Sequence, residues 1–316
     1  MPTPVFLTVD TELVWRHFVA GLPYSEIFSR SIHPGGVGLS HKLARFAAYG
    51  LKATFFVDPM PALRFGLDAV RRMVDPILEA GQEVQLHLHP NWAEAQGRRL
   101  SFEVSGLSAL AQRDVIDGAC ELLTAAGAPH PVAFRAGSYA ANDDTLDALL
   151  ALGFTYDASH NGAAAPWPSM ISLPQRQIAP VVHRGLIEVP VTLIEDRPGS
   201  YRQFQICALS IGEMRDALAH AIDAGHAALS IVSHSFELAN RSGSNANAIH
   251  LRRFEALCEL LATNADRAPT VQFRDRPHLS LGRGDEPLAP RAMRTRWRQA
   301  EQLWSNVFAE RGERVA

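Results

Sequence analysis

The chain has 316 residues, of which 47% are hydrophobic and 20% charged, and its formal net charge is −3. This length and composition indicate a globular protein with one large α/β domain or two smaller ones. The charge provides no general basic field that would favour nucleic acid or an anionic membrane as a partner. The 3 cysteines are widely spaced and odd in number, which indicates reduced thiols and excludes a disulfide framework.

The amino-terminal segment Met1–Asp10 enters a strand-like run almost at once. It lacks the basic start, apolar core and cleavage site of a secretory signal. No stretch reaches the ~18 apolar residues that suggest a membrane span. We therefore expect a cytoplasmic protein without a membrane span, and the sequence leaves a monomer and a homo-oligomer open.

Strand-like apolar runs alternate with amphipathic segments of helical length. The predicted strands are Val5–Val9, Ala53–Val57, Glu83–Leu88, Val132–Arg135, Leu186–Val189, Ala227–Ser233 and Thr270–Phe273. The predicted helices are Leu39–Tyr49, Leu67–Ala80, Ser108–Ala126, Asp143–Leu152, Ile211–Ala224 and Ala248–Leu261. Such alternation favours a parallel sheet wrapped by helices. We predict an α/β fold, a distorted (β/α) barrel of about seven strands related to the TIM barrel. An open doubly wound sheet is the alternative, but no Gly-rich phosphate loop follows the first strand.

Three segments depart from this alternation. We expect Trp15–Gly38 and Asn161–Val182 to be long loops that shape the substrate site at the barrel mouth. The tail from Pro290 is a predicted helix that packs on the body or on a partner subunit. Its apolar residues near helical spacing are Met293, Trp297, Trp304 and Phe308. The expected organisation is a barrel over residues 1–285 and a helical extension over 286–316.

Polar residues follow two of the predicted strands as pairs on one strand face. His87 and His89 are two residues apart, so their side chains point the same way, and neutral imidazole is a common metal ligand. Asp10 and Glu12 share a face if the first strand stays extended, and can provide a metal ligand and a general base. Each pair taken alone is equally compatible with a structural role, such as hydrogen-bonded core histidines or a helix cap.

Two further strand ends carry a cationic or titratable side chain. Arg135 emerges from an apolar run and needs an anionic partner, which is a carboxylate at the mouth or a purely structural ion pair. His234 ends another predicted strand, where it can act as a general acid or simply begin a loop. The carboxyl ends of parallel barrel strands converge on one mouth. The carboxylate pair, the histidine pair, Arg135 and His234 together therefore predict a single metal site.

The chain resembles the polysaccharide deacetylases, the fourth family of carbohydrate esterases, in motif order over Thr8 to about Glu237. Thr8–Glu12 is similar to the family's Thr-Phe-Asp-Asp-Gly motif, and His87–Pro90 resembles a contracted form of its histidine motif. The other segments that resemble family motifs are Arg135–Tyr139, Ser233–Ser235, Tyr156–Ser159 and the strand Ala53–Val57.

The resemblance implies a distorted (β/α) barrel and metal-dependent hydrolysis of an N-acetyl amide on a sugar or polysaccharide. Asp10 would be the general base, and His87 and His89 would bind the metal. Arg135 would keep Asp10 ionised and oriented, while His234 would protonate the departing amine.

Two positions depart from the family pattern. The residue after the base normally supplies a carboxylate to the metal, but it is Thr11 here, so we expect Glu12 to replace it, with Asp10 as the alternative ligand. One residue separates His87 from His89, where the family normally has three. The expected cofactor is a divalent ion, Zn²⁺ by preference, with Co²⁺, Ni²⁺ and Fe²⁺ open.

The expected substrate is an N-acylated saccharide, and the expected sugar-stacking residues are Trp15, Trp92, Tyr139 and Trp167. A first alternative is an enzyme of the same fold that hydrolyses a small non-carbohydrate amide. A second is an inactive barrel that binds a saccharide or a partner protein. A third is an amidohydrolase, but those barrels carry HxH on the first strand and often a bridging lysine, for which neither Lys42 nor Lys52 is well placed.

Overall fold

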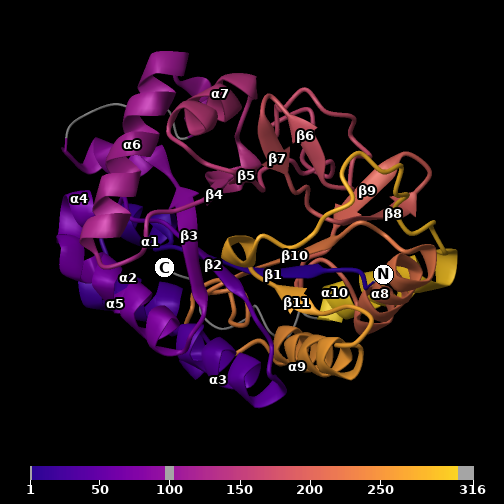
Figure 1. The fold of residues 1–316 in the computed structure, drawn as a ribbon. Coiled ribbons are helices and arrows are strands. Elements are labelled where there is room, and N and C mark those ends of the chain that lie inside the picture. The colour runs from indigo at the N-terminus through magenta and orange to yellow at the C-terminus, as the bar shows by residue number, and fades with distance from the viewer. Residues whose placement is uncertain (1, 97–102, 305–316) are drawn as a thin grey trace.

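The structure is a computed structural model, and it describes residues 2–96 and 103–304. A curled sheet of 9 strands runs in the order β10-β1-β2-β3-β4-β5-β7-β6, and β11 pairs with β1. Its strands are β1 (Val5–Thr11), β2 (Thr54–Val57), β3 (Glu83–Leu88), β4 (Ala133–Ala136), β5 (Tyr156–Asp157), β6 (Val181–His183), β7 (Leu186–Glu188), β10 (Leu229–His234) and β11 (Thr270–Val271). The β6–β7 pair is antiparallel and the other pairs are parallel. The predicted distorted (β/α) barrel is confirmed (Figure 1).

Helices cover the outside of the curled sheet (Figure 1). They are α1 (Trp15–Val19), α2 (Tyr24–Ile32), α3 (Leu39–Tyr49), α4 (Ala62–Phe65), α5 (Leu67–Glu79), α6 (Ala109–Ala125), α7 (Asp143–Ala151), α8 (Ile211–Ala224), α9 (Ala248–Thr263) and α10 (Ala292–Trp304). Short 3₁₀ turns are η1 (Pro34–Gly36), η2 (Pro90–Gln96), η3 (Val104–Gly106), η4 (Gly137–Tyr139) and η5 (Phe273–Asp275).

The chain after β7 spans the gap between the two ends of the sheet. The N–H of Val191 bonds the carbonyl of His160 (3.0 Å), and the N–H of Thr192 bonds the carbonyl of Ser230 on β10 (3.1 Å). The hairpin of β8 (Leu193–Arg197) and β9 (Ser200–Gln203) follows. Because these bonds reach from the β5 side to β10, the segment completes the barrel wall without forming a regular strand there.

Side-chain alternation sorts the strand residues into two layers. Val5, Leu7 and Val9 of β1 belong to the apolar layer between sheet and helices. Phe6 points to the barrel interior, where it stacks on Phe273 with ring centroids 4.5 Å apart. Above this aromatic plug the inward positions become polar, and they lead to the mouth where the strands end.

The predicted loop over Trp15–Gly38 is wrong, because α1, α2 and η1 occupy most of it. Ile27, Phe28 and Ile32 are buried along one side of α2, at the spacing of a helix that packs on a core. By contrast, the predicted loop over residues 161–182 is confirmed up to Val181, where β6 begins. The helices of the first segment were missed because α1 and α2 are short and separated by Gly21, so neither gives a long periodic pattern of apolar residues.

The predicted terminal helix is present as α10, and it contacts the body through charged residues. Met293 is 84% exposed, whereas Arg298 is 4% exposed and pairs with Asp196 of β8 and Glu213 of α8. The side chains of Trp297 and Trp304, and Phe308 altogether, lie outside the described residues. A network of buried charges therefore holds the described part of this helix to the body.

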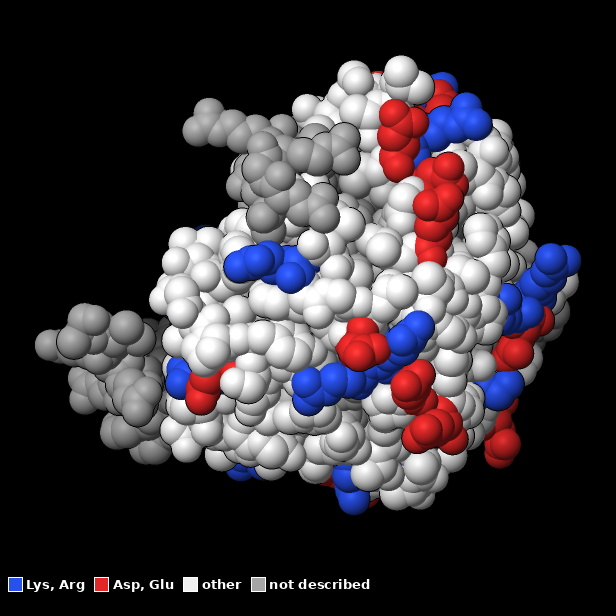
Figure 2. All heavy atoms as spheres, turned by 90° about the vertical axis from the view of Figure 1, so that its left-hand side faces the viewer, with Lys and Arg blue, Asp and Glu red and all other residues white. Residues whose placement is uncertain are grey.

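Within the described ranges, no helix combines the length and apolarity that a membrane crossing requires. Figure 2 shows the side of the molecule where α4, α5 and α6 lie, with acidic and basic side chains interspersed over it. Charges of both signs on this face agree with the formal net charge of −3.

Candidate metal centre and active site

The register of the sheet brings the predicted site residues together. Asp10 on β1 pairs with His234 on β10, and His87 on β3 pairs with Arg135 on β4. Parallel strands present their carboxyl ends at the same edge, so these side chains share the barrel mouth. The expected convergence of the strand ends is therefore what the structure shows.

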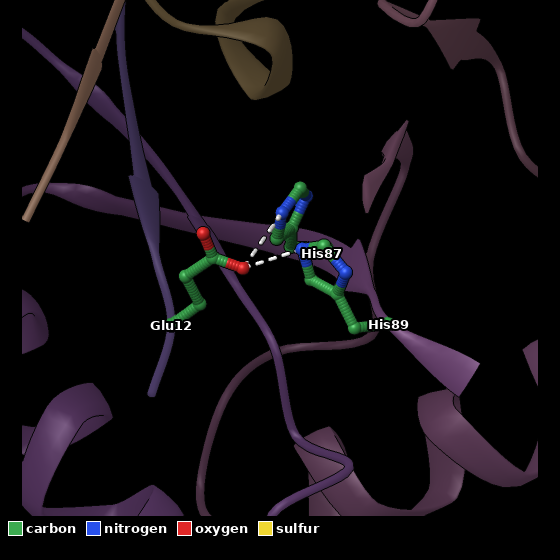
Figure 3. A group of neighbouring side chains, drawn as sticks. All are labelled: Glu12, His87 and His89. Atoms are coloured by element: carbon green, nitrogen blue, oxygen red, sulfur yellow. Dashed lines mark ion pairs between the residues drawn. The ribbon is translucent and has the colours of Figure 1, made fainter. Parts of the chain in front are cut away.

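Among the described residues, one group of three ligand-type side chains lies close enough to share a metal ion, and it consists of Glu12, His87 and His89. Their ligand atoms all lie within 4.8 Å of one another. Glu12 Oε2 is 3.7 Å from His87 Nε2 and forms a closer ion pair with His89 Nε2 (Figure 3).

The surroundings of this group fit a cation. His87 Nδ1 lies 2.8 Å from the carbonyl oxygen of Arg135, which can only accept, so this nitrogen donates and Nε2 is the ring nitrogen left to face Glu12 and a metal. Burial opposes the charge on His89, but the Glu12 carboxylate outweighs it and raises the pKa of His89 to about 9. Burial also opposes ionisation of Glu12, yet the two imidazoles hold its pKa well below the usual value. Two imidazoles and one carboxylate are the ligand set of many catalytic Zn²⁺ sites.

Gly137 makes room for the His89 ring. A Cβ on Gly137 would collide with three atoms of that imidazole, so a side chain there would displace the ring. The two residues that follow, Ser138 and Tyr139, have φ of 56° and 60°. Such left-handed backbone is unfavourable for residues with a Cβ and recurs at functional sites.

Asp10 is held by a buried ion pair. Arg135 Nη1 donates to Asp10 Oδ1 (2.7 Å) and to Thr8 Oγ1 (2.8 Å), and its guanidinium carbon lies 4.4 Å from the centre of the Phe56 ring. Burial alone would raise the pKa of Asp10, but the charge of Arg135 and its hydrogen bond lower that pKa below the usual value. On the other side, His234 Nε2 is 3.8 Å from Asp10 Oδ2.

A cavity of about 110 Å³ is lined by Asp10, Glu12, His87, His89 and His234, together with Tyr139. A neighbouring cavity of about 270 Å³ shares Glu12 and His89 with it and is walled by Trp15 and Trp92. The Trp92 ring is almost fully buried and contacts Trp15 edge-on, with centroids 4.9 Å apart. Trp167, the fourth aromatic residue expected to stack on a sugar, is 68% exposed in the loop after β5.

Sequence reasoning missed Asp58, which follows β2 and is buried. Its Oδ1 accepts from the N–H of Met60 (3.1 Å), and Oδ2 lacks a hydrogen-bond partner among the described residues. Burial, opposed in part by His89 and His87, raises its pKa to about 6. The signal was present, because Asp58 ends an apolar run as the other site residues do.

A second missed group supports the turn that carries His234. Glu237 accepts from the N–H of His234 (3.1 Å) and of Cys207 (2.9 Å). Lys42 from α3 is fully buried and donates to Ser233 Oγ (3.1 Å), one residue before His234. This lysine reaches the back of β10, and Lys52 pairs with Asp275, so among the described residues neither lysine bridges a metal as in many amidohydrolases.

Solved structures with a similar fold are candidate polysaccharide deacetylases. One from Mycobacterium smegmatis has 19% sequence identity and a TM-score of 0.55, and the match covers 95% of this chain and 91% of that one. Another from Pseudomonas aeruginosa has 16% identity and a TM-score of 0.56, with 86% and 89% covered. No family model matches the sequence, and no curated protein matches it either. At these identities the comparisons establish the fold, which is that of the polysaccharide deacetylases.

Proposed function

We propose that this chain is a divalent-metal-dependent hydrolase that removes an N-acetyl group from a sugar or polysaccharide. One observation carries the proposal. An ionised carboxylate, Asp10, lies between its buried arginine and His234, in the same cavity as the ligand group Glu12, His87 and His89. A base, a hydrogen donor and a set of metal ligands around one small space are the parts that amide hydrolysis needs.

Glu12, His87 and His89 would hold the metal, and Asp10 would be the base. A divalent ion held there would supply Lewis-acid chemistry, because it would polarise the amide carbonyl and make a nearby water more acidic. Asp10 accepts the proton of the attacking water, and Arg135 keeps it ionised and aimed at the cavity. His234, on the side of Asp10 away from Arg135, is placed to donate a hydrogen bond to the nitrogen that departs.

The two cavities support an acylated sugar as the substrate. The smaller cavity, about 110 Å³, has room for a few water-sized groups, at ~30 Å³ per water, which suits an acetyl group and the attacking water. The larger one offers the partly buried Trp15, with Trp92 buried behind it, and an aromatic ring is suited to pack against the apolar face of a sugar ring. Fold neighbours described as candidate polysaccharide deacetylases agree with this substrate class.

Metal content tests the first half of the proposal. We expect about one transition metal per chain in the purified protein by elemental mass spectrometry, and none in His87→Ala/His89→Ala. The matched control is His130→Ala/His278→Ala, which removes two exposed imidazoles elsewhere and should keep the metal. Absence of metal after reconstitution of the wild type with Zn²⁺ or Co²⁺ would overturn the proposal.

Acetate release tests the second half. We expect the metal-loaded protein to release acetate from N-acetylglucosamine oligomers, and the His87→Ala/His89→Ala variant to release none above background. Acetate release only from small non-sugar amides would support the proposed hydrolase activity but contradict the proposed sugar substrate. Stoichiometric saccharide binding without any acetate release would identify a binding protein instead.

A further inference from the structure

Three amide side chains form a continuous hydrogen-bonded chain that ends on the ring of His234. Asn161, in the loop after β5, donates from Nδ2 to Gln203 Oε1 (3.0 Å). Gln203 at the end of β9 bonds through Nε2 to Oε1 of Gln205, and Gln205 Nε2 is 3.2 Å from His234 Nδ1. Asn161 is fully buried, Gln205 is 7% exposed and Gln203 is partly buried, so the two ends of the chain are shielded from water.

The direction of these bonds is fixed at the end far from His234. The backbone N–H of Ala163, which can only donate, bonds Asn161 Oδ1 (3.0 Å). Asn161 must then offer its NH₂ group to Gln203, which accepts through oxygen and offers its own NH₂ to Gln205. By the same logic Gln205 presents NH₂, and not its oxygen, to the imidazole.

We propose that Asn161, Gln203 and Gln205, the amide relay, fix the tautomer of His234. An NH₂ group at Nδ1 requires this nitrogen to be an acceptor, so the proton of the neutral ring resides on Nε2. That nitrogen lies 3.8 Å from Asp10 Oδ2 and borders the cavity. A carboxylate in place of Gln205 would do the opposite, because it would accept from Nδ1–H. The three amides are thus positioning residues that act through His234.

The consequence for the reaction rests on the proposed function. A neutral imidazole that lost its Nε2 proton would become an anion, so His234 donates a hydrogen bond and keeps its proton. The proton that the nitrogen needs is then the one that Asp10 took from water. Water loses a proton to Asp10 as its oxygen bonds the carbonyl carbon, and Asp10 returns that proton to nitrogen as the C–N bond breaks.

The test is the protonation of His234 Nδ1, observed by ¹⁵N NMR of histidine-labelled protein above neutral pH, with His234→Gln used to assign the signals. We expect the resonance of a bare Nδ1 and a protonated Nε2 in the wild type. In Gln205→Glu we expect Nδ1 to become protonated, since the carboxylate can only accept. The matched control is Gln299→Glu, which adds the same charge on the exposed side of α10 and should leave the spectrum of the wild type.

A change at the far end separates the relay from its last member. In Asn161→Asp the side chain still accepts from Ala163 but can no longer donate to Gln203. Gln203 and Gln205 should then both reverse, and Nδ1 of His234 should become protonated. Protonation of Nδ1 in the wild type, or an unchanged spectrum in Gln205→Glu, overturns the proposal. If Nδ1 becomes protonated in Gln205→Glu but not in Asn161→Asp, the relay is overturned, and Gln205 alone sets the tautomer.

These spectra require no turnover, so they decide the tautomer even if the proposed hydrolase activity fails. If the enzyme is active, kcat of Gln205→Glu should fall by roughly 10- to 100-fold with KM nearly unchanged. A merely structural role of Gln205 would instead lower stability without moving the Nδ1 resonance.

Discussion

Asp10 and Glu12 are both carboxylates on one strand face, yet their surroundings give them different chemistry. Asp10 is paired with Arg135, a fixed cation, whereas Glu12 faces two imidazoles that can exchange a proton for a metal ion. Under the proposed function, the partner of each carboxylate, and not its residue type, makes Asp10 the base and Glu12 the metal ligand.

The division between these carboxylates gives a pair of predictions from isosteric variants. Asp10→Asn should lower the rate of acetate release by roughly 10²–10⁴-fold while the protein keeps its metal, because a base is lost and the ligands remain. Glu12→Gln should lose metal affinity along with activity. Metal analysis and kcat are measured on the same preparations. Loss of metal in Asp10→Asn would show that Asp10 itself ligates, which was the alternative at the sequence level.

Arg135 also bears on stability, because its partner is buried with it. Arg135→Met would leave the Asp10 charge buried without a counter-ion, which costs about 3–5 kcal/mol in comparable cases. Urea unfolding should show this loss, and Asp10→Asn/Arg135→Met should recover most of it. An equal loss in the double variant would mean that packing of the arginine on Phe56, and not its charge, stabilises the site.

At the scale of elements, the buried Lys42 joins α3 to β10, and the fold lowers the pKa of its ammonium group. Burial, opposed in part by the Glu237 charge, lowers the pKa of Lys42 from 10.5 to about 8. Below pH 8 the folded and unfolded states both hold this proton. Between about pH 8 and 10.5 only the unfolded state does, so the free energy of unfolding rises with pH in that window.

This linkage predicts a difference between the wild type and Lys42→Met. Relative to the variant, the wild type should gain roughly 3 kcal/mol of unfolding free energy between pH 7.5 and 10.5, at about 1.4 kcal/mol per unit of pKa shift. Other titrations are common to the two proteins and cancel in the difference. Urea unfolding at several pH values measures it. A constant difference across the window would show that Lys42 keeps its proton in the folded state.

The sequence predicted those elements whose signal is local and repeated. Apolar runs of β1, β3 and β10, each followed by a polar side chain, were sufficient to locate Asp10, His87 and His234, because parallel strands must end at one edge. The hairpin β8–β9 gave no such signal, since its strands are short and lie outside the main sheet. Gln203 and Gln205 were therefore invisible, as their role depends on which segments the fold brings beside His234.

Packing of the terminal helix on the body could be expected from the sequence, but not the residues that make the contact. Met293 of α10 is exposed, whereas Arg298 is buried. An arginine is rarely buried unless a carboxylate pairs with it. The carboxylates that pair with Arg298 are Asp196 and Glu213, which come from two other elements. Long-range charge pairing of this kind cannot be inferred from helical periodicity.

At the scale of the whole molecule, the site joins parts of the chain that are distant in sequence. Glu12 comes from the end of β1 and the two histidines from β3 and the residue after it (Figure 3). A metal bound by all three is available only to the folded protein, so its binding free energy adds to the stability of the barrel.

Thermal unfolding should consequently respond to metal. At a free Zn²⁺ concentration of 100 times Kd, a site present only in the folded state adds about 2.7 kcal/mol, and affinity of unfolded cysteines and histidines for the ion reduces this gain. We expect calorimetry to show a Tm higher by a few degrees with Zn²⁺ than with a chelator. The His87→Ala/His89→Ala protein should show no such difference, whereas His130→Ala/His278→Ala should respond as the wild type does. An equal response in both double variants would place the stabilising ion elsewhere in the molecule, because the unfolded-state histidines lost are the same in number and only the site differs.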